Sequence, residues 1–262
     1  MKQRRHYSLV GVLAWMLALL AAIHCPAPQN SSAPDASASA SGPAATTPAP
    51  GPAGSSAAPP PSAASGDAPT PSPDARPAIV FLGTSLTAGY GLPEDEAYPA
   101  LIQRRLDAAG LGYRVVNAGV SGDTSAGGLR RLDWLLKLPI AVLVVELGAN
   151  DMLRGQSIEA LEQNLTAILE RTRAVHPEAR LVVEGMRAAP NLGRDYAVAF
   201  DAIYPRVAER FGAALVPFVL EDVVARPQLN QADGIHPTAE GHALIAERVW
   251  KTLEPVVRQA ND

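Results

Sequence analysis

Short apolar runs alternate with helical patterns along the chain beyond residue 77. The runs have the length and the β-branched content of strands buried on both faces; they lie at 78–82, 113–117, 140–147, 181–183 and 213–216. Between them, apolar residues recur every three or four positions, as in helices with one buried face; these segments are 98–109, 129–136, 158–172, 196–211 and 244–253. We expect Ser157 and Thr238 to cap the helices that follow them. The alternation predicts an α/β fold, a three-layer αβα sandwich with helices on both faces of a five-stranded parallel sheet.

The start of the chain has a different pattern. Basic residues precede an almost wholly apolar run over 9–23, which is the arrangement of a secretory signal. At about 15 residues, the run is short for a membrane span. Cys25, the only cysteine, follows it where bacterial lipoproteins carry their lipid, although His24 stands where they have a small residue. We therefore expect an export segment over 1–25, with lipidation of Cys25 and plain secretion both open.

Residues 26–77 are rich in alanine, proline, serine, glycine and threonine, with scarcely any large apolar side chain. Such a segment cannot bury enough surface to offset the entropy of ordering, so we predict a disordered linker. The remaining part, 78–262, has the length of one domain, which we expect to be monomeric. The formal net charge of −4 gives no basic footprint for nucleic acid, and we expect no nucleic-acid partner.

Three predicted strands end in residues that suit catalysis. Ser85 follows the first strand after Gly83 and Thr84, and it either caps a helix or acts as a nucleophile. Gly122 follows the second strand and Asn150 follows the central one. Both fit simple turns, but their amides also suit stabilisation of an oxyanion. Since the carboxyl ends of parallel strands meet at one edge of the sheet, we expect these residues to lie close together.

A histidine near the end of the domain suits the role of a general base. His236 lies in a loop before the last predicted helix, and Asp233 precedes it by three residues. This spacing lets Asp233 accept the Nδ1 proton while Nε2 faces outward. No third ligand accompanies the pair, so we expect neither a metal nor a cofactor.

These stretches, in this order, resemble the four blocks of the SGNH (GDSL-type) hydrolase family. The similarity covers the whole domain and is greatest to the branch with bacterial periplasmic thioesterase, protease and lysophospholipase enzymes and arylesterases. The matching residues are Gly83-Thr84-Ser85-Leu86, Gly122, Gly148-Ala149-Asn150-Asp151 and Asp233-Gly234-Ile235-His236-Pro237, and Gly185-Met186-Arg187 resembles a substrate-side segment of that branch.

The resemblance implies a flavodoxin-like fold and assigns a role to each matching residue. Ser85 would be the nucleophile, His236 the base and then the acid, and Asp233 the group that orients His236. The oxyanion would be held by the amides of Ser85 and Gly122 and the side chain of Asn150. The family usually has aspartate where this chain has Thr84, so the turn must make its hydrogen bonds differently.

The sequence thus predicts an exported serine esterase that hydrolyses carboxylic esters or thioesters through an acyl-serine intermediate. We expect it in the periplasm or cell envelope, with membrane attachment through Cys25 or the N-terminal segment as an open possibility. A carbohydrate deacetylase or an acyltransferase would share the same residues and differ in the acceptor. A tethered binding module without turnover is a third alternative, which the intact set of Ser85, Asn150 and His236 disfavours.

Overall fold

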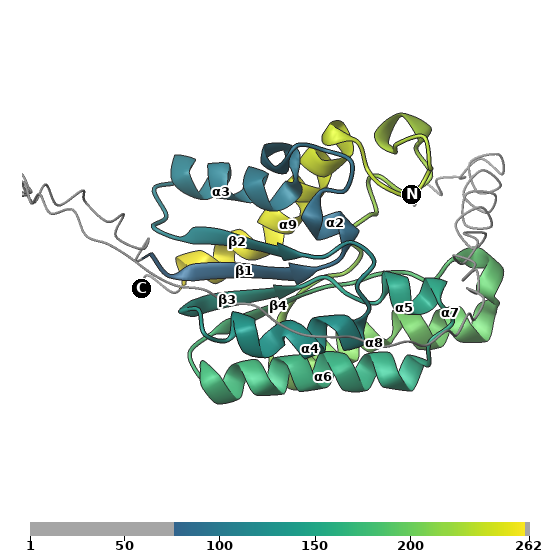
Figure 1. Cartoon of the computed structure of the whole chain (residues 1–262), viewed down its shortest axis with the longest axis horizontal. Helices are drawn as coiled ribbons and strands as arrows, with labels where there is room; N and C mark the ends of the chain where they lie inside the picture. The colour runs from purple at the N-terminus through teal and green to yellow at the C-terminus, as the bar shows by residue number, and fades with distance from the viewer. Residues whose placement is uncertain (1–75, 260–262) are drawn as a thin grey trace, which may run out of the picture. The chain divides into compact units, whose positions relative to one another are not determined.

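The computed structural model describes residues 76–259 (Figure 1). The predicted export segment 1–25 lies outside the described residues, as does the predicted linker 26–77 except for its last two residues. The first strand begins at Ala78, where the apolar pattern begins in the sequence.

Five parallel strands form one sheet in the order β2-β1-β3-β4-β5. This confirms the predicted five-stranded parallel sheet, and the order is that of a doubly wound, flavodoxin-like fold. The strands are β1 (Ala78–Gly83), β2 (Arg114–Gly119), β3 (Ile140–Val145), β4 (Arg180–Glu184) and β5 (Ala214–Val216). The longest apolar run forms the central strand β3, which ends one residue before Glu146.

Helices cover both faces of this sheet, as the alternation predicts. Figure 1 shows α2, α3 and α9 on one face and α4, α6 and α8 on the other. Their bounds are α2 (Ser85–Ala88), α3 (Tyr98–Ala108), α4 (Ser125–Leu135), α5 (Ala149–Leu153), α6 (Ile158–Val175), α7 (Arg194–Asp201), α8 (Ile203–Phe211) and α9 (Ala239–Arg258). The expected caps form, because the Ser157 hydroxyl accepts from the amide of Ala160 and the Thr238 hydroxyl accepts from the amide of Gly241.

The segment 196–211, predicted as one helix, is two helices joined at Ala202. Pro205 explains the break, because it has no amide hydrogen to donate to the carbonyl of Asp201 four residues earlier. The Asp201 carboxylate, at the end of α7, accepts from the amide of Ala188, 2.8 Å away, in the loop after β4.

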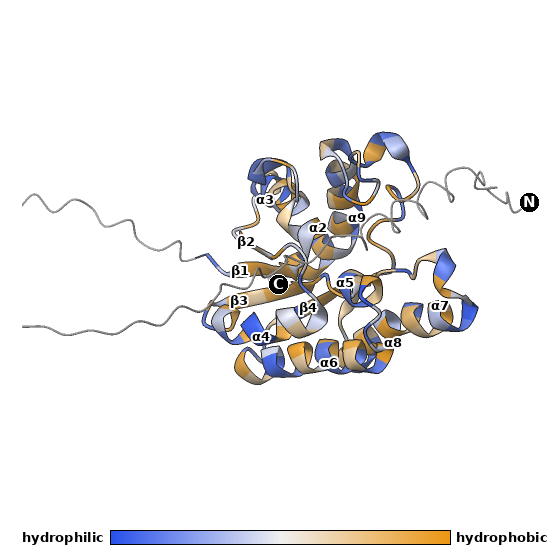
Figure 2. Cartoon of the chain, turned by 45° about the vertical axis from the view of Figure 1, so that its right-hand side comes forward, coloured by the Kyte–Doolittle hydropathy of each residue, from blue (hydrophilic) through white to orange (hydrophobic). Residues whose placement is uncertain are grey.

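The core lies on both sides of the sheet. Every residue of β1 is buried, and β1 and β3 appear mostly orange in the hydropathy colouring of Figure 2, while the helices show one apolar and one polar side. Burial on both faces of the sheet explains why β1 and β3 read as unbroken apolar runs. Within 76–259, none of the helices has the length and apolar character needed to span a bilayer.

Candidate active site

Ser85 is the first residue of α2, immediately beyond the carboxyl end of β1. Thr84 caps this short helix and accepts from the amide of Leu86. Gly83 is required before it, because a Cβ at that position would lie 1.9 Å from the Thr87 hydroxyl oxygen. The strand therefore turns sharply into the helix and presents Ser85 at the edge of the sheet.

The structure brings Ser85, His236 and Asp233 into one hydrogen-bonded series. Nε2 of His236 lies 3.0 Å from the Ser85 hydroxyl oxygen, and Nδ1 lies 2.7 Å from an Asp233 carboxylate oxygen. The other carboxylate oxygen accepts from the backbone amides of Ile235 and His236. Asp233 thus holds both the ring and the loop. With the ring proton on Nδ1, Nε2 is free to accept the Ser85 hydroxyl hydrogen.

Two neighbours complete the surroundings of the His236 ring. The ring of Tyr90 lies over it, with the two centroids 4.5 Å apart. Burial raises the pKa of Asp233, but the hydrogen bonds from the His236 side chain and from two backbone amides outweigh burial and leave this pKa below its ordinary value. Asp233 therefore stays ionised beside His236 throughout the neutral range.

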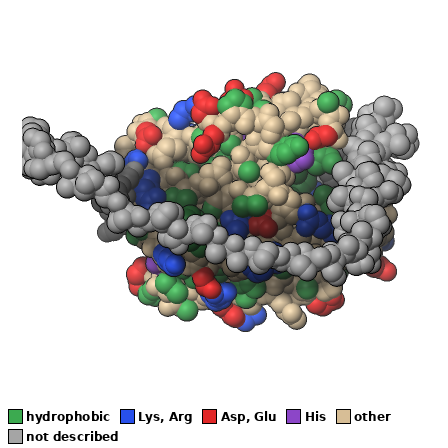
Figure 3. All heavy atoms as spheres, viewed as in Figure 1, with side chains coloured by type: hydrophobic (Ala, Val, Ile, Leu, Met, Phe, Trp, Pro, Cys, Tyr) green, Lys and Arg blue, Asp and Glu red, His purple; other side chains and the backbone are tan. Residues whose placement is uncertain are grey.

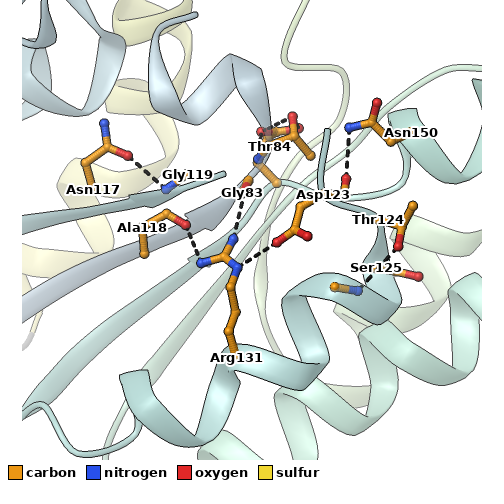
Figure 4. A network of polar contacts seen from close by, with 12 residues as sticks. Gly83, Thr84, Asn117, Ala118, Gly119, Asp123, Thr124, Ser125, Arg131 and Asn150 are labelled. Atoms are coloured by element: carbon orange, nitrogen blue, oxygen red, sulfur yellow. Dashed lines mark hydrogen bonds and ion pairs between the residues drawn. The ribbon is translucent and has the colours of Figure 1, made fainter. Parts of the chain in front are cut away.

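Gly122 and Asn150 line the same cavity as Ser85 and His236. Gly122 has a φ of 80°, in the left-handed region that favours glycine, and it lies in the turn that leads into α4. The Asn150 side chain donates one amide hydrogen to the carbonyl of Asp123, 2.8 Å away (Figure 4). Its second amide hydrogen remains to be donated elsewhere. All the residues predicted for the site thus meet at one edge of the sheet.

Short α5, which carries Asn150, is fastened to α4 through Asp151. The Asp151 carboxylate is buried and accepts from both the amide and the hydroxyl of Ser125, at 2.8 and 2.5 Å. The side chain of Asn164 in α6 donates to the same hydroxyl. These contacts fix α5, and hence the direction in which Asn150 points.

The cavity beside Ser85 has a volume of about 390 Å³, within the usual range for small-ligand sites. Its walls are largely apolar and are built from Leu86, Tyr90, Ala149, Leu153, Met186, Leu220, Ile235 and Pro237. Met186 comes from the predicted substrate-side segment. The arrangement suits a substrate with an apolar group next to the bond that reacts.

Glu146 is a residue of the site that the sequence analysis did not single out. Its buried carboxylate accepts from the amide and hydroxyl of Thr84 and from the amide and hydroxyl of Thr87, at 2.8 to 3.3 Å. Burial raises the pKa of Glu146 above its ordinary value, and these hydrogen bonds offset only part of that effect. Glu146 therefore accepts the hydrogen bonds that hold the turn around Ser85. The signal in the sequence was a lone charge inside an apolar run.

A second buried polar group lies behind the turn. The hydroxyl of Tyr98 lies 3.0 Å from the Thr87 hydroxyl and 3.1 Å from an oxygen of Glu184. The amide of Tyr98 donates to Nδ1 of His242, 3.1 Å away in α9. Burial, and to a smaller degree the charge of His236, lowers the pKa of His242 from 6.5 to about 4, so His242 is a neutral core residue. No cluster of three or more histidine, cysteine or acidic residues suited to a metal occurs within the described range.

A doubly wound α/β domain with serine, histidine and aspartate in hydrogen-bonded series at the carboxyl edge of its sheet has the construction of a serine hydrolase. Comparison with known proteins is more specific. The sequence profile of the GDSL-like Lipase/Acylhydrolase family matches residues 81–244. The chain therefore belongs to this family, which confirms the predicted resemblance and the predicted class, the GDSL-type serine esterases.

Individual relatives agree with this assignment. The chain is 43% identical over 184 residues to "Esterase TesA" of Pseudomonas aeruginosa, an alignment that covers 70% of this chain and 90% of that protein. It is also 43% identical over 185 residues to "Thioesterase 1/protease 1/lysophospholipase L1" of Escherichia coli K12, covering 70% and 86%. Among solved structures, a crystal structure of TesA matches with a TM-score of 0.65 and 44% identity, covering 68% of this chain and 98% of that one.

Proposed function

We propose that this protein is an exported esterase that hydrolyses carboxylic esters or thioesters, with Ser85 as its nucleophile. The observation that carries the proposal is the contact between the Ser85 hydroxyl and His236 Nε2 inside an apolar cavity, with Asp233 bound to the other ring nitrogen. A nucleophile in contact with a base, itself oriented by a third group, is the arrangement that activates a serine.

The reaction follows from this geometry. His236 Nε2 takes the Ser85 proton as the hydroxyl oxygen bonds to the substrate carbonyl carbon. The amides of Ser85 and Gly122 and the side chain of Asn150 donate to the oxyanion of the tetrahedral intermediate. When the intermediate collapses, the bond to the leaving group breaks, and the alcohol or thiol departs with the proton from His236. Water then attacks the acyl-serine by the same route and releases the acid.

The cavity favours an apolar acyl group as the part of the substrate beside Ser85. Its walls are mostly aliphatic and aromatic, which suits acyl chains better than the hydroxyl-rich ring of a sugar. The names of the relatives include esterase, thioesterase and lysophospholipase, which supports the same substrate class for this chain. The deacetylase alternative is less well supported for this reason.

Export and membrane attachment are further parts of the proposal. They are supported by the basic start and the apolar run at 9–23, and Cys25 offers a site for a lipid. On the uncovered part of the face in Figure 3, acidic and basic side chains are interspersed, which supports a function without nucleic acid. Recovery of the full-length chain from the cytoplasm after cell fractionation would contradict export.

A panel of substrates tests the activity. We expect kcat/KM for nitrophenyl esters to rise by about fourfold per added methylene until the cavity is filled, because each buried methylene contributes about 0.8 kcal/mol. An acyl-CoA and a lysophospholipid measure preference for the leaving group, and Ser85→Ala is the blank for each assay. A preference for acetylated sugars over all of these would favour the deacetylase instead.

A further inference from the structure

Arg131 in α4 belongs to none of the sequence motifs, yet it lies at the centre of the contacts in Figure 4. Its Nε donates to the Asp123 carboxylate at 2.7 Å. One terminal nitrogen donates to the carbonyl of Ala118 at 2.6 Å, and the other donates to the carbonyl of Gly83 at 2.9 Å. One guanidinium group therefore joins the end of β1, the end of β2 and the loop that follows β2.

Two of these acceptors, Gly83 and Asp123, lie close in sequence to residues of the site. Gly83 stands two residues before Ser85, and Asp123 directly follows Gly122. The carbonyl of Asp123 accepts from the Asn150 side chain. Resting on the proposed function, we infer that Arg131 is a positioning residue for the oxyanion site: it sets the place of the Gly122 amide and of the Asn150 side chain relative to Ser85.

The sheet alone does not fix this relation. Pairing between β1 and β2 ends with Gly83 opposite Gly119, before either chain reaches the site. At that point the amide of Val120 donates to the carbonyl of Gly83. Arg131 bonds to the ends of both strands, at Gly83 and Ala118, and ties them to the following loop through Asp123. The Arg131 and Asp123 side chains are only 23% and 16% exposed, so solvent screens the pair less than at an open surface. Arg131 does not line the cavity and acts only through these neighbours.

The planar guanidinium is suited to this task because its donors form a fixed fork. A lysine ammonium has its donors on one atom and cannot reach three separated acceptors. In Arg131→Lys we expect kcat to fall about tenfold to hundredfold, since a misplacement of about 1 Å costs up to about 10²-fold. KM should change less than about threefold, because the cavity walls are untouched.

A neighbouring residue offers a matched control. Arg130 lies in the same helix and is exposed, so Arg130→Lys should keep the wild-type kcat and KM. Asp123→Ala is the second variant, because it removes the carboxylate that Arg131 binds and keeps the carbonyl that Asn150 binds. We expect it to lower kcat with little change in KM, and it preserves the test if Arg131→Lys does not fold. Circular dichroism and thermal melting of each variant identify losses that come from unfolding.

A double-mutant cycle with Asn150→Ala separates positioning from general support of the fold. If Arg131 acts through the oxyanion donors, Arg131→Lys should lower kcat several-fold less in the Asn150→Ala background than in the wild type. A wild-type kcat in Arg131→Lys would overturn the inference, as would equal fold-losses in the two backgrounds. Retained turnover in Ser85→Ala, by contrast, would overturn the proposed function itself, so the two failures are distinct.

Discussion

Thr84, the residue before Ser85, is held by one buried carboxylate, that of Glu146. The Thr84 hydroxyl donates to Glu146, and both groups are almost fully buried, at 2% and 1% exposed. A hydroxyl is a suitable neighbour for this carboxylate because it can donate to it. The turn that presents Ser85 therefore depends on a neutral donor at this position.

This contact makes Thr84→Asp informative. Two carboxyl groups about 3 Å apart in a buried site cannot both ionise, so the folded variant has to hold a shared proton. The folded state would then bind more protons than the unfolded state, and its free energy of unfolding should fall by up to about 1.4 kcal/mol per pH unit above the ordinary range of the carboxyl pKa. Urea denaturation at several pH values measures this slope.

Thr84→Ser is the control for that experiment, because it keeps the hydroxyl that donates to Glu146. It should show the wild-type dependence of stability on pH. If Thr84→Asp follows the same dependence as Thr84→Ser, the two carboxyl groups do not share a proton, and our account of the turn is wrong.

At the scale of elements, the sequence predicted what depends on local pattern. The apolar runs correctly predicted the five strands of the sheet. The positions of Ser85, Gly122 and Asn150 after strand ends correctly predicted that they lie together at the carboxyl edge of the sheet. The break between α7 and α8 depends on Pro205, a local signal that the helical spacing obscured.

The contacts that support the site were not predictable in the same way. Glu146 reaches Thr84 and Thr87 across about 60 positions of sequence, with separations of 62 and 59. Arg131 reaches the carbonyl of Gly83 across 48 positions. No spacing rule links such residues, because their proximity follows from the order of strands and the packing of α4 on the sheet. The sequence therefore predicts which groups react, and the structure shows the contacts that hold those groups in place.

At the scale of the whole molecule, the buried side chains of Glu184 and His242 make the free energy of unfolding depend on pH in opposite directions. Burial and the charge of Glu146 raise the pKa of Glu184 well above 4.5, although a hydrogen bond from Tyr98 opposes the shift. The contribution of Glu184 to the free energy of unfolding therefore falls as the pH rises above 4.5. The pKa of His242 is lowered to about 4, so between pH 4 and pH 6.5 the unfolded state binds more protons than the folded state. The contribution of His242 to the free energy of unfolding therefore falls as the pH drops from 6.5 towards 4.

Removing the ring of His242 should isolate the contribution of this side chain to the pH dependence of stability. In His242→Asn the side-chain oxygen can replace Nδ1 as acceptor for the amide of Tyr98, but the side chain does not titrate. Loss of the ring's packing should make the variant less stable than the wild type at pH 7. This difference should shrink by about 3 kcal/mol between pH 7 and pH 4, since each pKa unit corresponds to about 1.4 kcal/mol. Urea denaturation of both proteins checks this, and a difference that stays constant with pH would mean that His242 is not held neutral by the fold.

Covalent labelling tests the central claim, that Ser85 is activated by His236, most directly. The protein is treated with a fluorophosphonate, and the adduct is measured by intact mass and located by peptide mapping. We predict one adduct, on Ser85, with none in Ser85→Ala and labelling at least about 10³-fold slower in His236→Gln, because a serine without its base is a poor nucleophile. An adduct on another residue that abolishes esterase activity, or Ser85 labelling at an unchanged rate in His236→Gln, would contradict the account.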